Sequence, residues 1–210
     1  TNLHVNNFTF NNGTLGDMGI YGYWDNEHKG IFLDADMNEN DLGLTSVTGF
    51  IYPIAPNGGL DLTIAAKGTN IKFLEEYMKG IATDVNGRAY GSVRLHGPFK
   101  GLNLEGDLLT DASLRIGILN TSFALNDSLR FTSNGISFKD IQLTDPETQS
   151  GKLNGELKYQ HFKNLSYHFD INAYNLLVMN THETPDMPFF GKIYASGNTT
   201  ISGNQAGLNV

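Results

Sequence analysis

Apolar and polar residues alternate along most of this chain. The alternation is clear in residues 60–66 (LDLTIAA), 129–132 (LRFT) and 165–173 (LSYHFDINA). Because successive side chains of a strand point to opposite faces, each segment has one apolar and one polar face. Strands buried on both faces would read as continuous runs of Val, Ile and Leu instead. The pattern predicts an all-β fold of mostly antiparallel strands.

Turn signals between these segments indicate a long meander. Asn-Gly pairs supply the positive φ that two-residue hairpins require, so we expect turns wherever they occur. The further alternating segments are 93–96, 102–105, 114–118, 136–139 and 153–159, and the Asn-Gly pairs are at 12–13, 57–58, 86–87, 134–135 and 154–155.

One segment has helical rather than strand spacing. It predicts a short amphipathic helix over 70–80, with Asn70 capping its start and Lys79 and Gly80 at its end. We expect it to cover one face or end of the sheet, in preference to acting as an independent binding helix. The apolar residues at helical spacing are Ile71, Leu74, Tyr77, Met78 and Ile81.

The chain also repeats itself. Gly155 follows Gly49 by 106 positions, and the same offset relates a set of five residues in each half. This predicts one repetitive β-rich segment over 1–210 with an internal repeat of about 106 residues, approximately 49–104 and 155–210. Since the chain begins with Thr1 and ends in a strand-like stretch, we expect it to be a segment of a longer protein. The repeated set is Gly91, Gly97, Gly101, Leu102 and Asn103, matched by Gly197, Gly203, Gly207, Leu208 and Asn209.

Charge and composition exclude several classes of protein. The formal net charge is −8, so the chain would be repelled by the phosphates of nucleic acid, and we expect no nucleic-acid partner. There is no cysteine, which removes disulfides, cysteine zinc sites and thiol nucleophiles. No apolar run approaches the roughly 20 residues of a membrane-spanning helix.

Motifs for catalysis or metal binding are weak. Residues 34–41 (DADMNEND) open like a calcium loop, but Glu39 stands where Gly is needed and Thr45 where Glu is needed. The exposed face of a strand explains these acids better. His96 and His168 fall on polar strand faces, and His182-Glu183 falls in a loop beside Pro185-Asp186. We therefore expect no catalytic residue, metal or cofactor, and no enzyme.

Several segments resemble the translocation and assembly module (TamB) family of the AsmA-like superfamily, in the variant found in Bacteroidetes-type bacteria. They are 97–106 (GPFKGLNLEG), 119–121 (LNT), 136–145 (ISFKDIQLTD), 172–181 (NAYNLLVMNT) and 189–197 (FFGKIYASG). Their order across roughly residues 45–210 carries the resemblance.

The resemblance implies an origin in a long envelope protein. Members of the family are anchored in the inner membrane by one N-terminal helix, absent here, and cross the periplasm toward an outer-membrane partner of the Omp85 type. Their sheet curls into an open half-pipe (a β-taco) with an apolar concave face. They are implicated in phospholipid transport between the membranes and in outer-membrane protein assembly.

The resemblance and the alternation together predict a hydrophobic groove that holds phospholipid acyl chains. A sheet with one apolar face has to bury that face, close into a barrel, or cover it with ligand. The expected groove residues, chosen by strand face, are Leu62, Ile64, Val93, Leu95, Leu102, Leu104, Leu114, Ile116, Ile118, Leu129, Phe131, Ile136, Phe138, Leu153, Leu157, Tyr167, Phe169 and Ile171.

Three alternatives stay open from the sequence. Each groove residue would also be apolar in the core of a closed β-sandwich, as in a non-catalytic surface adhesin or scaffold. A β-helix enzyme acting on polysaccharide would gather Asp34, Asp36 and another acid in a cleft. An outer-membrane barrel would show aromatic girdles, which are not clear here.

Overall fold

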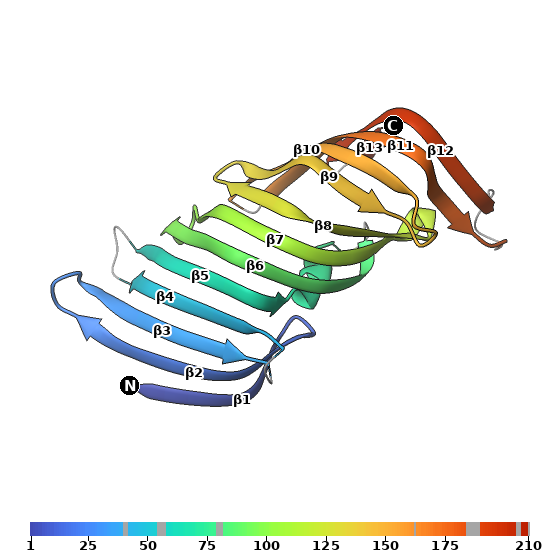
Figure 1. Ribbon diagram of the computed structural model, residues 1–210. Coiled ribbons are helices and arrows are strands. Elements are labelled where there is room, and N and C mark those ends of the chain that lie inside the picture. The colour runs from blue at the N-terminus through green and yellow to red at the C-terminus, as the bar shows by residue number, and fades with distance from the viewer. Residues whose placement is uncertain are drawn as a thin grey trace.

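The computed structural model describes residues 1–39, 42–53, 58–78, 82–161, 163–183, 190–204 and 207–209. Over these residues the chain forms one 13-stranded sheet (Figure 1). Each strand pairs antiparallel with the next strand in sequence, from one edge of the sheet to the other. The prediction of an all-β antiparallel meander is confirmed.

The helices and strands follow one another without a crossover. They are β1 (Asn2–Phe10), β2 (Gly13–Asp25), β3 (Gly30–Asn38), β4 (Leu44–Tyr52), β5 (Gly59–Asn70), η1 (Lys72–Met78), β6 (Ala82–Pro98), β7 (Asn103–Ile116), η2 (Gly117–Leu119), β8 (Thr121–Thr132), β9 (Gly135–Thr144), β10 (Ser150–Gln160), β11 (Lys163–Thr181), β12 (Gly191–Asn204) and β13 (Gly207–Asn209).

The predicted strands agree with this order except at one end. Alternation predicts a strand over 114–118, but β7 ends at Ile116 and Gly117–Leu119 form a turn of 3-10 helix. Asn120 follows in the left-handed conformation, with φ 47°, and its N–H donates to the carbonyl of Gly117. The strand prediction was therefore wrong at Ile118, because a local turn overrides the alternation there.

Strand register brings the apolar faces of neighbouring strands together. Leu95 pairs with Leu62 on one side and with Leu104 on the other. In the second half of the sheet, Leu153 pairs with both Ile141 and Ile171. Directly paired residues of antiparallel strands point to the same face, so the apolar residues form one continuous surface.

The sheet bends toward its apolar face without closing. β8 and β11 lie three positions apart in the sheet yet contact each other, and Asn120, just before β8, donates from Nδ2 to the carbonyl of Asn180 at the end of β11. Neighbouring strands are about 4.8 Å apart, so a flat sheet would hold β8 and β11 about 14 Å apart. Since β1 and β13 lie at opposite edges, the result is an open, curled sheet (Figure 1), consistent with the predicted half-pipe. We call its apolar side the concave face and its polar side the convex face.

The Asn-Gly pairs serve two different roles. Those at 12–13 and 134–135 lie at tight turns, as predicted, and Asn57 lies outside the described residues. The pairs at 86–87 and 154–155 lie inside β6 and β10, so the turns predicted there were wrong. Gly87 and Gly155 have φ 129° and 142°, an extended conformation that only glycine adopts readily. They kink a strand rather than end it.

Bulges add further curvature at three strands. Asn7, Asp140 and Asn175 each have φ of 51° or 52° and lie where the register shifts. In each case the bulged N–H donates to a side chain of the neighbouring strand, over 2.8 to 2.9 Å. The acceptors are Asp17 Oδ1, Asn154 Oδ1 and Ser196 Oγ. Such bulges increase the local twist and bend the strand that carries them.

The predicted helix is present but is shorter and more tightly wound than expected. Lys72–Met78 form a 3-10 helix, and Asn70 Oδ1 accepts from the N–H of Lys72 over 3.0 Å, as a cap should. Ile71 is buried against β5 and β6, whereas Tyr77 is 63% exposed. No residue of the helix itself is buried, so the helix covers the sheet less closely than predicted. Residues 79–81, the predicted end of the helix, lie outside the described residues.

Strands in the two halves of the predicted repeat share conformations at matched glycines. Gly49 in β4 has φ 149° and Gly155 in β10 has φ 142°. Gly91 in β6 has φ 129° and Gly197 in β12 has φ 122°. The repeat stays a prediction, but the same kinks recur at the same spacing.

Candidate functional site: the concave face

The predicted groove residues that lie in strands all point to the concave face. Leu62, Val93 and Leu153 are buried, and the other predicted residues whose side chains the structure describes are half-buried. A closed core would bury nearly all of them, so this face is partly open. The half-buried residues are Ile64, Leu95, Leu102, Leu104, Leu114, Ile116, Leu129, Phe131, Ile136, Phe138, Leu157, Tyr167, Phe169 and Ile171; the Ile118 side chain lies outside the description.

The apolar surface also extends over strands that the sequence prediction left out. Leu62 continues through Gly49 of β4 to Leu33 of β3, and Ile20 of β2 pairs with Leu3 of the edge strand. Alternation in 31–37 was the signal that could have found these positions. The added concave residues are Leu3, Val5, Met18, Ile20, Trp24, Ile31, Leu33, Ala35, Met37, Val47 and Ile51.

The two long sides of the curled sheet differ. One side carries the tight turns at 26–29, 98–102, 133–134 and 161, and we call it the tip rim. The other carries η1, η2, the turn at 145–149 and the end of β11, and we call it the helix rim. Figure 1 shows the two helices on the side opposite these turns, and the β1–β2 turn at 11–12 lies on the side of the helices.

Burial increases from the tip rim toward the helix rim. Along β9, Ile136 and Phe138 are half-buried, while Ile141 is 0% exposed. Leu176 and Leu177 at the far end of β11 are 2% and 1% exposed. On these strands the concave face is closed toward the helix rim and accessible toward the tip rim. On β7, Leu114 and Ile116 are half-buried up to the helix rim.

The last part of β11 forms most of this closed wall. Beyond the bulge at Asn175 the strand turns back toward β8, and Asn120 Nδ2 donates to the carbonyl of Asn180 over 2.7 Å. The buried carboxylate of Asp145 accepts from the N–H of Leu177 at 2.7 Å. It also accepts from two N–H groups of its own turn, at Glu147 and Gln149. A buried charge with three donors is well compensated and fixes the wall.

One contact joins two turns of the tip rim across an intervening hairpin. His161 Nδ1 lies 3.3 Å from the carbonyl oxygen of Leu102, and the His161 ring lies beside Gly101. These turns extend past the shorter β8–β9 hairpin between them. The rim is therefore bridged at β7–β10. Nearer the N-terminus, the ring of His28 in the turn at 26–29 stacks on Phe50 of β4, with the centroids 4.5 Å apart.

Inside the concave face, aromatic rings meet across strands. Phe138 of β9 and Phe169 of β11 are 5.2 Å apart with an interplanar angle of 88°, an edge-to-face pair. Gly155 lies between them in register, so the kinked glycine leaves room for both rings. The pair marks the middle of the concave face.

The total exposed area is large for a chain of this mass. The protein exposes 12615 Å², whereas a compact protein of 23.1 kDa would expose about 9,700 Å². The excess follows from a single sheet that no second layer covers. A closed sandwich is therefore not the architecture of the described residues, and an antiparallel meander is not a β-helix.

The convex face carries ion pairs and an unexpected row of aromatic rings. Arg94 donates two hydrogen bonds to Asp61, each of 2.7 Å, and this contact holds the pKa of the Asp61 carboxyl below its ordinary value. The rings lie on β2–β4 with neighbouring centroids 5.2 to 6.1 Å apart. Two of these pairs cross between strands and two lie along one strand. The rings are those of Tyr21, Tyr23, Phe32, Phe50 and Tyr52.

The candidate acids and histidines are not gathered into a cleft. Asp34 and Asp36 lie on the exposed face of β3, where they accept from Thr48 and Ser46 of β4. His168 is exposed on the convex face, and His182-Glu183 is exposed beyond β11. Pro185-Asp186 lies outside the described residues. In the part of the chain that the structure describes, no three metal-ligating side chains come together.

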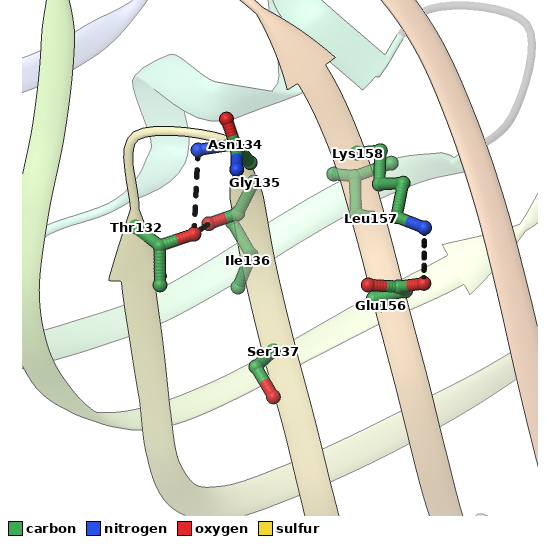
Figure 2. Close-up of a pocket in the computed structure, with 8 residues that line it drawn as sticks. All are labelled: Thr132, Asn134, Gly135, Ile136, Ser137, Glu156, Leu157 and Lys158. Atoms are coloured by element: carbon green, nitrogen blue, oxygen red, sulfur yellow. Dashed lines mark hydrogen bonds and ion pairs between the residues drawn. The ribbon is translucent and has the colours of Figure 1, made fainter.

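Open depressions lie on the surface, lined by both polar and apolar atoms. One of about 370 Å³ lies over β10, β11 and β12, and its lining residues are Lys152, Asn154, Asp170, Ile171, Asn172, Asn198, Thr199 and Thr200. Figure 2 shows another of about 50 Å³ between the β8–β9 turn and the end of β10, lined by Thr132, Asn134, Gly135, Ile136, Ser137, Glu156, Leu157 and Lys158. Lys158 Nζ and Glu156 Oε1 are 2.6 Å apart at its edge. Its volume suits one or two water molecules.

No protein-family model, curated protein or solved structure matches the chain. Among the described residues, no helix is both long enough and apolar enough to span a membrane.

Proposed function

We propose that this chain is a segment of an envelope-spanning periplasmic protein whose concave face carries phospholipid acyl chains between the inner and outer membranes. The same proposal includes a role in outer-membrane protein assembly. The parent protein would bind an Omp85-type partner through regions outside this segment. The chain acts without catalysis.

One observation carries the proposal: an apolar surface runs across the paired strands from β1 to β11, and no second layer formed by the described residues covers it. Soluble proteins rarely leave a contiguous apolar surface of this extent in water, so a ligand is expected to cover it. The continuity across strands suits a cargo that moves along the sheet.

The energetics favour long alkyl chains. Burial of one CH₂ group contributes about 0.8 kcal/mol, so a chain of about 16 carbons gains on the order of 10 kcal/mol before ordering costs. This gain is non-directional and similar along the surface. An acyl chain can therefore move from one set of strands to the next without a deep energy minimum.

A photoreactive amino acid at Phe138 or Phe169 tests the proposal. With the chain expressed in the periplasm, irradiation should attach phospholipid to the protein at these concave positions, detected by mass spectrometry. Asn172 is exposed on the convex face of β11 and serves as the matched control position. It should give little or no lipid adduct.

Adducts with protein alone, in equal yield at Phe138 and Asn172, would contradict lipid carriage. That result would favour the surface adhesin or scaffold instead.

A further inference from the structure

The two rims of the concave face differ in charge as well as in burial. The described turns of the tip rim contain Glu27 against Lys29 and Lys100, together with His28 and His161. Asp25, which ends β2, is occupied by the N–H groups of Glu27 and His28 at 2.8 and 2.9 Å. The described loops and helices of the helix rim contain Lys72 and His182, and six acidic residues: Glu39, Glu75, Glu76, Asp145, Glu147 and Glu183. Three of these acids form ion pairs, Glu39 with Arg88, Glu75 with Lys72 and Glu147 with Lys192. Asp145 is occupied by backbone N–H groups, as Asp25 is, so the acidic excess of this rim comes from Glu76 and Glu183.

This difference decides where an anionic group can lie. A phosphate at the helix rim would meet an excess of carboxylates, whereas at the tip rim it would meet exposed lysines. Charges separated by more than about 8 Å are screened at physiological salt, so the local balance matters more than the net charge of the chain. Although the protein as a whole is acidic, we therefore expect a phosphate to bind at the tip rim and not at the helix rim.

The depth of the half-buried zone matches the length of an acyl chain. From the tip of β9, Ile136 and Phe138 are half-buried, and full burial begins at Ile141. On β6 the same change occurs between Leu95 and Val93. The acyl chains of one leaflet extend about 15 Å, half of a bilayer core, and a strand rises about 3.3 Å per residue. A tail entering at the tip rim would therefore cover about four to five residues, which is the open zone on β6 and β9.

We propose that phosphate-bearing headgroups lie along the tip rim at turns 26–29 and 98–102, with their acyl chains extending across the concave face toward the helix rim. The inference rests on the proposed function. It adds the rim at which the lipid headgroup lies, the direction in which the acyl chains extend, and the chemistry of the headgroup. Lys29 and Lys100 meet the phosphate, and the buried wall at Ile141 and Leu176 stops the tails.

Two photoreactive phosphatidylglycerols test the orientation, one with a diazirine on the headgroup and one with a diazirine at the end of an acyl chain. The headgroup probe should label 26–29 or 98–102, and the acyl probe should label residues near Ile141 or Leu153. Headgroup labelling at η1, η2 or 145–149 would overturn the orientation but keep lipid carriage. If neither probe labels the concave face or its rims, the proposed function fails as well.

Charge reversal tests the role of the lysines. Lys29→Glu with Lys100→Glu should reduce labelling by phosphatidylglycerol at least three-fold, and leave labelling by a diazirine-bearing diacylglycerol unchanged. Diacylglycerol has no phosphate, so its labelling also reports that the variant is folded. Lys67→Glu with Lys152→Glu, at two exposed lysines away from the tip rim, is the matched control and should change neither. Unchanged phosphatidylglycerol labelling, or an equal loss of both lipids, would overturn the assignment.

Discussion

At the scale of single residues, curvature depends on glycines that no other residue can replace. Gly155 has φ 142°, and a Cβ atom there would clash with the carbonyl oxygen of His168 on the paired strand. The same glycine lies in register between Phe138 and Phe169. One position thus sets both the path of β10 and the space for the aromatic pair.

Gly155→Ala should lower the free energy of unfolding by about 2–4 kcal/mol, because the backbone has to leave its conformation or push β11 away. Urea denaturation measures the loss. Gly19→Ala is the matched control, since a Cβ at Gly19 in β2 meets nothing within 4 Å. It should change stability by less than about 1 kcal/mol. Equal effects of the two substitutions would mean that the kink is not required.

The buried phenol of Tyr159 makes the free energy of unfolding depend on pH. It is 8% exposed, its hydroxyl donates to the carbonyl of Thr132 over 3.4 Å, and burial raises its pKa. Because the folded pKa is above the unfolded value, the stability contributed by the neutral phenol is complete below pH of about 10 and is lost as pH rises through the folded pKa.

Tyr159→Phe should therefore flatten the fall in stability above pH of about 10, at a loss of about 0.5–1 kcal/mol at neutral pH. Urea denaturation between pH 7 and pH 11 measures both. The control is Tyr174→Phe, at a side chain that is 78% exposed. If the free energy of unfolding of Tyr159→Phe fell as steeply above pH of about 10 as that of the wild type, this account would be refuted.

At the scale of the elements, η1 joins the first hairpin to the middle of the sheet. The Phe73 ring lies 5.7 Å from that of Phe10, and the Phe73 backbone closely approaches Gly13. Ile71, just before the helix, is buried in the cluster on β5 and β6. These contacts close the helix rim at the N-terminal end.

Phe73→Ala should lower stability by about 2–3 kcal/mol and increase amide hydrogen exchange in β1 and β2, since the lost ring packs against that hairpin. Tyr77→Ala, on the exposed side of the same helix, should change stability by less than about 0.5 kcal/mol. Exchange that rises equally in both variants would show that η1 does not hold the hairpin.

The elements also show how far sequence reasoning reaches. Alternation predicts the strands and their apolar faces, because a hydrophobic period of two residues is typical of a β-strand alone. An Asn-Gly pair is compatible with two structures. At 134–135 it forms a turn, and at 154–155 it kinks a strand. Only the length of the paired strands decides between them. The helix at 72–78 was likewise predicted, but its 3-10 winding depends on how η1 packs against β1, β2 and β6.

At the scale of the whole molecule, the concave face is one surface shared by all the strands. Its residues were largely predictable, since each strand shows its own apolar face. The two rims were not, because the return of β11 toward β8 and the bridge from His161 to Leu102 join residues about 60 positions apart. Local patterns carry no information about such contacts.

Analysis of co-purifying lipid tests the central claim most directly. The chain, expressed in the periplasm and purified without detergent, is examined by native mass spectrometry beside two single variants of β9, Phe138→Glu and Ser137→Glu. Phe138 points to the concave face, and Ser137 is exposed on the opposite face. The account predicts bound phospholipid in the wild type and in Ser137→Glu, and at least a five-fold loss in Phe138→Glu. Folded wild-type protein free of lipid, or lipid retained equally in both variants, would contradict it.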